Sequence, residues 1–400
     1  MRPFAPYGAP NSVVALGPEL EAWRKDIHRH PELGYEETRT AALVAEKLRS
    51  FGFDRVETGI GETGVVGVLH GAGGPTASEA EAILLRADMD ALPMTEETGA
   101  DHASTIPGKM HACGHDGHTT MLLGAAKRLA DTRNFKGTVY VCFQPAEEGG
   151  AGAKAMIEDG LFDRFPCRAV FGMHNWPGLP VGQFAVRPGP MLASADEFRI
   201  SLIGRGGHAA KPDKARDPIV AGAHLVMALQ TLVSRRTDPL QPAVVSVTTF
   251  HGGSAFNVIP ERVEITGTVR SFDEAVQEAL HAGVREMTAQ TAALFDMAAE
   301  TWRSPVTYPP TVNDPEVTGF VADLLKRFAG AENVYDDARP TLGGEDFSYM
   351  AREKPGCFVF CGNGDSASLH NAKYDFNDAA LPYGVAYWCR LVEEALPKGV

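Results

Sequence analysis

The sequence predicts an α/β protein in which a large domain carries a smaller inserted α+β module. Short apolar runs that read as buried strands alternate with longer runs that read as helices, the order typical of α/β folds. Between residues 198 and 303 the order becomes strand, helix, strand, strand, helix and strand, which is typical of a ferredoxin-like module. With 400 residues, the chain is long enough for two domains.

The first part of the large domain follows a segment rich in Pro and Gly, residues 1–12, which we expect to be loosely structured. Helices are predicted over residues 19–27 and 36–51, because Pro31 follows the first and Gly52 ends the second. Apolar strands are predicted over residues 63–69, 82–87, 138–143 and 168–173. A further helix is predicted over residues 121–129.

The inserted module lies between Pro190 and Pro305, and prolines near glycines at such boundaries suit hinges. Its strands are predicted over residues 198–203, 244–251, 264–271 and 299–303, and its helices over residues 217–232 and 274–295. The large domain then resumes with helices over residues 314–328 and 382–396 and a strand over residues 358–361. We therefore expect one domain over residues 13–189 and 306–397 and another over residues 190–305.

The composition excludes several classes of partner. A formal net charge of −14 and a pI near 5.4 argue against nucleic acids and anionic membrane surfaces. No apolar run is long enough to cross a bilayer, and the first residues lack the apolar core of a signal peptide. Six cysteines without paired spacing fit reduced thiols, so we expect a cytoplasmic protein without a disulfide framework.

The stretch HACGHDGHTT, residues 111–120, concentrates three histidines, a cysteine and an acid within eight positions. Thiolate, imidazole and carboxylate groups are the side chains that bind transition metals. Cys113 and His115 are two residues apart, so an extended backbone would place both on the same side. Taken alone, the stretch fits equally well a turn with one buried thiol and solvent-facing histidines.

Further acids and histidines follow the predicted strands. The strands over residues 82–87, 138–143, 168–173 and 358–361 are followed by Asp90, the pair Glu147 and Glu148, His174 and His370. Open α/β sheets place their ligands at the carboxyl edge of the strands, so these side chains could converge there. We expect Asp90 to orient a metal-bound histidine.

Five donors are enough for two metal ions that share one bridging ligand: Cys113, His115, Glu148, His174 and His370. Such a pair of ions polarises a carbonyl group and lowers the pKa of a bound water. Adjacent carboxylates at a strand end point in different directions, so Glu147 can stay free as a base. The pattern therefore predicts metal-assisted hydrolysis of an amide.

These segments together resemble the metal-dependent aminoacylase and carboxypeptidase family of peptidases, in particular its hippurate hydrolase (N-acyl-amino-acid amidohydrolase) branch. The resemblance covers nearly the whole chain. Its motifs are DIHRHPEL (26–33), LRADMDALP (85–93), HACGHDGHTT (111–120), FQPAEEGG (143–150), GMHN (172–175), GRGGHAA (204–210), FNVIPE (256–261), GTVR (267–270) and LHN (369–371).

The resemblance implies a three-layer α/β/α catalytic domain with a mixed sheet and a dinuclear metal site. Cys113 would be the bridging thiolate, where the carboxypeptidase relatives have an aspartate. His115, Glu148, His174 and His370 would complete the two metal sites, and Glu147 would be the general base. The inserted module would be a lid that also mediates assembly into a homodimer or homotetramer.

The resemblance also implies roles for three residues of the lid. His208 would contact the substrate and stabilise the oxyanion, either within its own protomer or across a dimer. Asn257 and Arg270 would hold the substrate carboxylate, a task that suits Arg because its planar fork pairs two oxygens. Glu345 would be a supporting residue.

The implied reaction is the hydrolysis of small N-acyl amino acids, such as N-benzoyl or N-acetyl amino acids, by a metal-bound hydroxide. The products would be a carboxylic acid and a free amino acid. The thiolate and imidazoles favour zinc, cobalt or nickel, and the carboxylates also suit manganese. The alternatives are a dipeptidase or carboxypeptidase, a deacetylase of acetylated diaminopimelate, and a metal-dependent binding protein without activity.

Two positions depart from the pattern of the branch. Asp213 follows Lys211-Pro212 where the branch usually has a histidine, and Ala372 follows Asn371 where it usually has a proline. Neither position is a proposed ligand, so we expect the departures to affect the shape of the substrate pocket.

Overall fold

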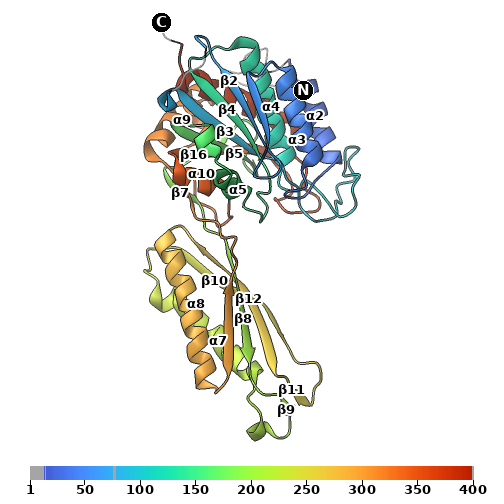
Figure 1. Ribbon diagram of the computed structural model, residues 1–400, viewed down its shortest axis with the longest axis vertical. Coiled ribbons are helices and arrows are strands. Elements are labelled where there is room, and N and C mark those ends of the chain that lie inside the picture. Colours follow the sequence, from blue (N-terminus) through green and yellow to red (C-terminus); the bar gives the residue numbers. More distant parts are fainter. Residues whose placement is uncertain (1–12, 14, 75–77, 399–400) are drawn as a thin grey trace. The chain divides into compact units, whose positions relative to one another are not determined.

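The apolar runs of the sequence form a mixed sheet of eight strands in the computed structural model, which describes residues 13, 15–74 and 78–398 (Figure 1). Residues 1–12, for which a loose structure is predicted, lie outside this range. The chain divides into two compact units. Unit 1 comprises Met1–Met191, Val312–Arg339 and Asp346–Val400, and unit 2 comprises Leu192–Thr311 and Pro340–Glu345.

The sheet of unit 1 has the strand order β1-β2-β4-β3-β5-β16-β6-β15. Its central strands β4, β3, β5 and β16 are parallel, whereas β1, β2 and β6 pair with their neighbours toward the centre in antiparallel fashion. The strands are β1 (Arg55–Ile60), β2 (Gly64–His70), β3 (Ala82–Asp88), β4 (Thr138–Gln144), β5 (Ala169–Pro177), β6 (Phe184–Ala185), β15 (Val334–Tyr335) and β16 (Gly356–Gly364). The β3 and β4 strands are buried along their full length, as expected for strands covered on both faces.

Helices cover both faces of this sheet. One layer contains α2 (Gly17–Arg29), α3 (Thr38–Ser50), α4 (His115–Thr132), α9 (Pro315–Ala329) and α11 (Leu381–Ala395). On the other face lie α5 (Gly152–Glu158), α6 (Leu161–Arg164) and α10 (Phe347–Glu353), where Phe347 packs against Phe358 of β16. The predicted α/β class with a large mixed sheet is confirmed. The α4 helix begins six residues before the predicted start at residue 121, so its first turn carries part of the HACGHDGHTT stretch.

Unit 2 is a four-stranded antiparallel sheet with two helices. Its strand order is β10-β12-β8-β13, and the helices α7 and α8 contribute Leu225, Leu229, Leu280 and Val284 to its core. The elements are β8 (Asp196–Ile203), α7 (Pro218–Thr231), β10 (Ala243–Gly252), β12 (Arg262–Ser271), α8 (Glu274–Leu294) and β13 (Ala298–Arg303), with a small pair of strands, β9 (Gly207–His208) and β11 (Val258–Ile259). A further short pair, β7 (Gly189–Leu192) and β14 (Thr311–Asn313), lies where the chain passes between the units.

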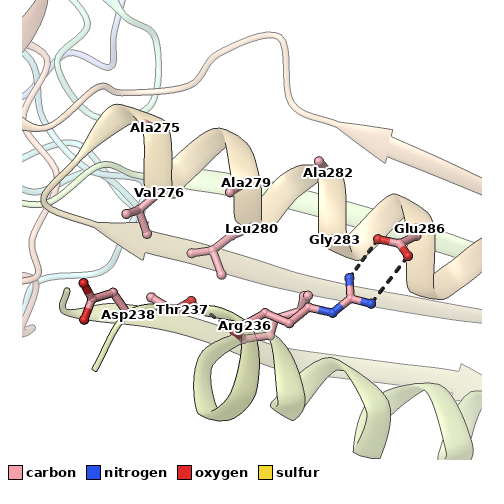
Figure 2. A pocket seen from close by; sticks show the side chains of 11 residues that line it. Arg236, Thr237, Asp238, Ala275, Val276, Ala279, Leu280, Ala282, Gly283 and Glu286 are labelled. Atoms are coloured by element: carbon pink, nitrogen blue, oxygen red, sulfur yellow. Dashed lines mark hydrogen bonds and ion pairs between the residues drawn. The ribbon is translucent and has the colours of Figure 1, made fainter. Parts of the chain in front are cut away.

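A cavity of about 520 Å³ within unit 2 lies between α8 and the π-helical turn Leu232–Arg236 (Figure 2). Arg236 Nη1 donates to Glu286 Oε2 at 2.8 Å across one side of it. None of the residues predicted to form the site lines this cavity. Among the described residues, no helix is long and apolar enough to cross a membrane.

Candidate metal centre

The predicted metal ligands of unit 1 lie together at the carboxyl edge of its sheet. The candidate ligands form two groups, and within each group the donor atoms lie within 4.8 Å of one another. One group is Cys113, His115 and His174, and the other is Cys113, Glu148 and His370. Cys113 therefore belongs to both groups. His174 comes from β5, Glu148 follows β4, and His370 follows β16. Segments far apart in the sequence thus bring all five predicted donors to one place.

The position of Cys113 depends on a tight turn at Gly114. Gly114 has a φ of +90° and directly precedes α4, which begins at His115. A Cβ at this position would come within 2.1 Å of Asn175 Nδ2 and 2.6 Å of Tyr374 Oη. Only glycine fits the conformation and the space together, so the turn at Gly114 sets the position of Cys113 relative to His115.

Distances within the two groups are short. Cys113 Sγ lies 3.3 Å from His174 Nε2, and Glu148 Oε1 lies 3.0 Å from His370 Nε2. The backbone N–H of His370 donates to the carbonyl oxygen of Ala112 at 2.8 Å, although the two residues are far apart in the chain. This bond fixes the His370 segment beside the residue that precedes Cys113.

Asp90 connects two of the candidate ligands. Its Oδ1 lies 3.1 Å from His115 Nδ1, and its Oδ2 accepts the backbone N–H of Glu148 at 2.8 Å. The other ring nitrogen of His115, Nε2, is buried and has no hydrogen-bond partner among the described residues. An imidazole that is oriented by a carboxylate and keeps one buried nitrogen unpaired suits a metal ligand.

A second layer of buried polar groups, which the sequence analysis did not assign, lies behind the candidate ligands. His118 Nδ1 bonds Asp88 Oδ1 at 2.6 Å, and His118 Nε2 accepts the backbone N–H of Asn175 at 2.9 Å. The Asn175 amide donates to the carbonyl oxygen of Cys113 at 2.6 Å and accepts from the Tyr374 hydroxyl at 2.7 Å. Asn175 follows His174 directly, so one amide links two segments that carry candidate ligands.

The electrostatics of the cluster favour a cation. Burial, and then the charges of Glu148 and Glu147, raise the pKa of the Cys113 thiol well above its usual range. Burial lowers the pKa of His115, but the carboxylates of Asp88 and Asp90 outweigh it and raise this pKa to about 10. Burial, and then His118, lower the pKa of His174 well below its usual range. Anionic donors in a buried site stabilise bound divalent cations, and a bound cation makes the thiolate the favoured form of Cys113.

Glu147 is also buried at this edge. Its carboxylate lies within 4.8 Å of donor atoms of His115 and Glu148. The preceding residue, Ala146, has a φ of +50°, and its backbone N–H donates to the buried carboxylate of Glu37 at 2.8 Å. This left-handed residue turns the chain after β4, so the two adjacent glutamates leave the strand in a defined turn.

A buried charge network supports the same edge from the sheet. Arg86 of β3 donates to Asp88 Oδ2 at 2.8 Å and to Asp346 Oδ1 at 2.9 Å. Asp346 also accepts from the side chain of Gln144 at 2.8 Å. Glu345, the predicted support residue, is buried and belongs to unit 2, whereas its neighbour Asp346 belongs to unit 1.

Two of the predicted substrate-contacting residues are neighbours in unit 2. His208 of β9 pairs with Val258 of β11, and the Ala209 N–H donates to the Asn257 carbonyl oxygen at 3.0 Å. The exposed His208 ring accepts the backbone N–H of Ala210 at Nδ1, 3.1 Å away. This bond favours the tautomer with a proton on Nε2, which can then donate to a substrate oxygen.

Arg270 lies at the opposite end of unit 2. Its strand, β12, runs from Arg262, which pairs with Ile203 on the side of Asn257, to Val269, which pairs with Asp196. The eight residue-to-residue steps from Arg262 to Arg270 span about 26 Å at the rise of a β-strand. Figure 1 shows β9 and β11 beyond one end of this sheet. Asn257 and Arg270 of one protomer are therefore too far apart to hold the same carboxylate.

Comparisons with known proteins establish the family of this chain. The model of the peptidase family M20/M25/M40 matches residues 84–394. The chain belongs to this family. It is 43% identical to a hippurate hydrolase of Campylobacter jejuni over 95% of this chain and 97% of the relative. It is 40% identical to an N-acetyl-L-cysteine deacetylase of Bacillus subtilis over 93% of this chain and 87% of the relative.

Among solved structures, the family member is similar to the YXEP protein of Bacillus subtilis, described as a dinuclear metal binding peptidase of the M20 family. The TM-score is 0.81 at 33% identity, and the match covers 96% of this chain and 99% of that one. The protein is therefore a hydrolase of the M20 family that acts on amide bonds. Its unit 1 holds clusters of candidate metal ligands at the carboxyl edge of the sheet.

Proposed function

We propose that this M20 hydrolase cleaves the amide bond of small N-acyl amino acids with the help of two divalent cations. The observation that carries the proposal is the shared thiol: Cys113 belongs both to the group with His115 and His174 and to the group with Glu148 and His370. Hippurate and N-acetyl-L-cysteine, named in two relatives, are both N-acyl amino acids, which supports this substrate class.

In this proposal Cys113 would help to hold two cations, one together with His115 and His174 and the other together with Glu148 and His370. His115 Nε2, which has no hydrogen-bond partner among the described residues and lies 3.8 Å from Asp88 Oδ2, and the buried carboxylates of Asp90 and Glu147 fit such a pair. When bound, the cations supply polarisation of the substrate carbonyl and a lower pKa for a water molecule. The donor set suits zinc, cobalt, nickel or manganese, so elemental analysis must identify the metal.

Glu147 serves as the general base and acid. It accepts a proton from the attacking water at a carboxylate oxygen and then donates that proton to the departing nitrogen. The C–N bond breaks as the new C–O bond becomes a carboxylate, so amide and water give an acid and a free amino acid. Asp90 holds His115 and the Glu148 backbone in place, which keeps these two candidate ligands in fixed positions during the reaction.

Three residues of unit 2 complete the site. His208 Nε2–H donates to the carbonyl oxygen as negative charge develops there. Arg270 pairs with the substrate carboxylate. The Nη1 of Arg270 donates to the Val269 carbonyl oxygen at 2.9 Å. Burial lowers the pKa of Arg270, although the charge of Asp196 opposes this effect. Because Arg270 lies far from His208 and Asn257, we propose that the two ends of unit 2 serve different sites of a homodimer, with His208 and Asn257 in the partner's site.

A surface for such a dimer is present on unit 2. The α7 helix exposes Val220 and Met227, whose exposed fractions are 53% and 71%. The adjacent strand β10 is an edge strand, so its outer backbone groups are free to pair with another strand. Apolar side chains beside an unpaired strand edge are typical of a protein interface.

The test combines metal analysis with a substrate panel. N-benzoylglycine, N-acetyl amino acids, dipeptides and N-acetyl-diaminopimelate are compared with the purified metal-loaded enzyme. We expect two divalent cations per chain and the highest kcat/KM on an N-acyl amino acid. A preference for dipeptides or for acetylated diaminopimelate would change the substrate class. A metal-loaded protein with no activity on the panel would overturn the proposal in favour of a binding protein.

A further inference from the structure

A second cavity lies in unit 1 beside β5, the strand that carries the candidate ligand His174. It has a volume of about 380 Å³, and its walls come from the ends of β5, β6 and β15, from the middle of β16, and from the segments that follow β5 and β15. In the strand order, β16, β6 and β15 follow β5, the strand that carries His174. The cavity therefore extends across the strands from β5 toward β15, and none of the candidate metal ligands lines it.

The wall nearest the metal centre is aromatic. The rings of Trp176 and Phe360 stack with their centroids 4.0 Å apart and an interplanar angle of 17°. Phe360 is in register with His174 on the neighbouring strand. The Trp176 ring lies edge-on to the His174 ring, 6.4 Å between centroids. The aromatic wall thus begins one side chain away from a candidate ligand.

The rest of the cavity is suited to an apolar group. Leu179, Ala185 and Tyr335 also line it, and the Tyr335 side chain is 51% exposed. The charged lining residues, Asp337 and Arg339, are exposed to solvent. An exposed aromatic lining beside a stacked pair of rings favours a flat apolar ligand, because aromatic rings gain from offset or edge contacts in addition to the area they bury.

The segment that forms the outer wall is held in place from within unit 1. Arg187 Nη1 donates to the carbonyl oxygen of Ala338 at 2.9 Å and lies 4.0 Å from Asp337 Oδ1. The backbone N–H of Val186 donates to the Tyr335 carbonyl oxygen at 2.8 Å. The cavity is therefore bounded by anchored backbone.

We propose that this cavity is a subsite for the aromatic or other flat apolar group of an N-acyl amino acid, and that Trp176 selects for that group. The inference rests on the proposed function. The ring can belong to the acyl group, as in N-benzoylglycine, or to the amino-acid side chain, as in N-acetylphenylalanine. Both present the same chemistry to Trp176, and the experiment distinguishes them.

The experiment compares kcat/KM of the metal-loaded enzyme on N-benzoylglycine, N-acetylphenylalanine and N-acetylalanine. Trp176→Ala is expected to lower kcat/KM about tenfold on the substrate whose ring occupies the cavity, mainly through KM, and less than threefold on N-acetylalanine. Trp176→Phe, which keeps an aromatic ring, is expected to restore most of the loss. Trp302→Ala, at an exposed Trp of β13 outside the cavity, is the matched control.

A selective loss on one ring-bearing substrate supports the proposal and identifies the group that binds. An equal loss on all three substrates, or no loss on any, overturns it. If Trp176→Ala does not fold, Tyr335→Ser tests the same wall at a half-exposed ring and is expected to show the same selectivity in weaker form. A wild-type enzyme that hydrolyses none of the three substrates would refute the proposed function itself, and the two failures are thereby distinguished.

Discussion

Asn175 is the residue whose single side chain holds two parts of the candidate metal centre together. Its amide joins the Cys113 carbonyl oxygen to the Tyr374 hydroxyl, and all three groups are buried. Asn175→Ala leaves a buried donor and a buried acceptor unpaired, each costing about 1–3 kcal/mol. We expect it to weaken metal binding by about 10- to 100-fold.

A competition titration with a metal-chelating dye measures this affinity directly. Asn333→Ala removes a part-buried amide that donates to the Ala329 carbonyl oxygen and is not among the candidate ligands, and it serves as the control. An unchanged metal affinity of Asn175→Ala would show that the hydrogen bonds of the Asn175 amide are not needed to position the candidate ligands.

The two adjacent glutamates are expected to separate by function. Glu147→Gln should lower kcat by about 10²- to 10⁴-fold, because the proton acceptor is lost, while the metal content stays at the wild-type level. Glu148→Gln should instead lower the metal content, because Glu148 is a proposed ligand. Steady-state kinetics with metal analysis of both variants checks the assignment. Loss of metal from Glu147→Gln would reassign that residue as a ligand.

His28 gives the protein a pH-dependent contribution to stability. Burial lowers its pKa, but the charge and hydrogen bond of Asp116 and the contact with Glu96 outweigh burial and raise it to about 9. Arg24 also faces Asp116, at 3.7 Å. Because the folded pKa lies above the unfolded value of about 6.5, the stabilisation is fully present below that pH and is lost as the pH rises through 9.

Urea unfolding of the wild type and His28→Gln between pH 6 and 10 tests this point. The difference in the free energy of unfolding should be largest at pH 6, up to about 3 kcal/mol, and should shrink toward pH 10. Curves that stay parallel across the whole range would rule out a charged His28 in the folded protein.

At the scale of elements, the turn into α4 decides where Cys113 lies. Gly114→Ala should destabilise the fold by at least about 2 kcal/mol more than Gly108→Ala. Both positions have a positive φ, but a Cβ at residue 114 meets Asn175 and Tyr374, whereas one at residue 108 meets nothing within 4 Å. Chemical denaturation of both variants isolates the clash from the backbone strain. Equal destabilisation of the two variants would mean that the side chains of Asn175 and Tyr374 can shift to make room for the Cβ.

The α4 helix also shows which parts of the fold could not be predicted from the sequence. Period and composition located most of the helices and central strands, because burial on both faces leaves a long apolar signal in the chain. They missed the start of α4, since its first turn is polar, and they missed β6 and β15, which have two residues each. A strand of two residues carries no readable alternation.

The candidate site, like the fold, could be predicted only in part. Donors that follow strands could be named from the sequence, because the carboxyl edge of a sheet gathers them. Asn175 and Tyr374 could not, since an amide and a phenol become partners only through contacts between distant segments. The opposite placement of Asn257 and Arg270 depends on strand pairing in unit 2, which residue spacing does not reveal.

For the whole molecule, the placement of His208 predicts complementation between inactive variants. In a dimer with shared sites, His208→Ala lacks the oxyanion donor and Glu147→Gln lacks the base. A heterodimer of the two restores one complete site, so an equal mixture should regain about a quarter of the wild-type activity.

Subunits exchanged under mild denaturant, or co-expressed with two different tags, provide the mixture. The heterodimer fraction is measured by tandem affinity purification. Verified heterodimers without recovered activity would place His208 in its own protomer's site.

Unit 1 is built from chain segments on both sides of unit 2, and the last proposed ligand, His370, comes from the later segment. During translation, the ribosome therefore makes Cys113, His115, Glu148 and His174 well before the fifth donor, with all of Leu192–Thr311 in between. In the proposed site, a nascent chain has only four of the five ligands through that interval, so full cation loading requires the synthesis of His370.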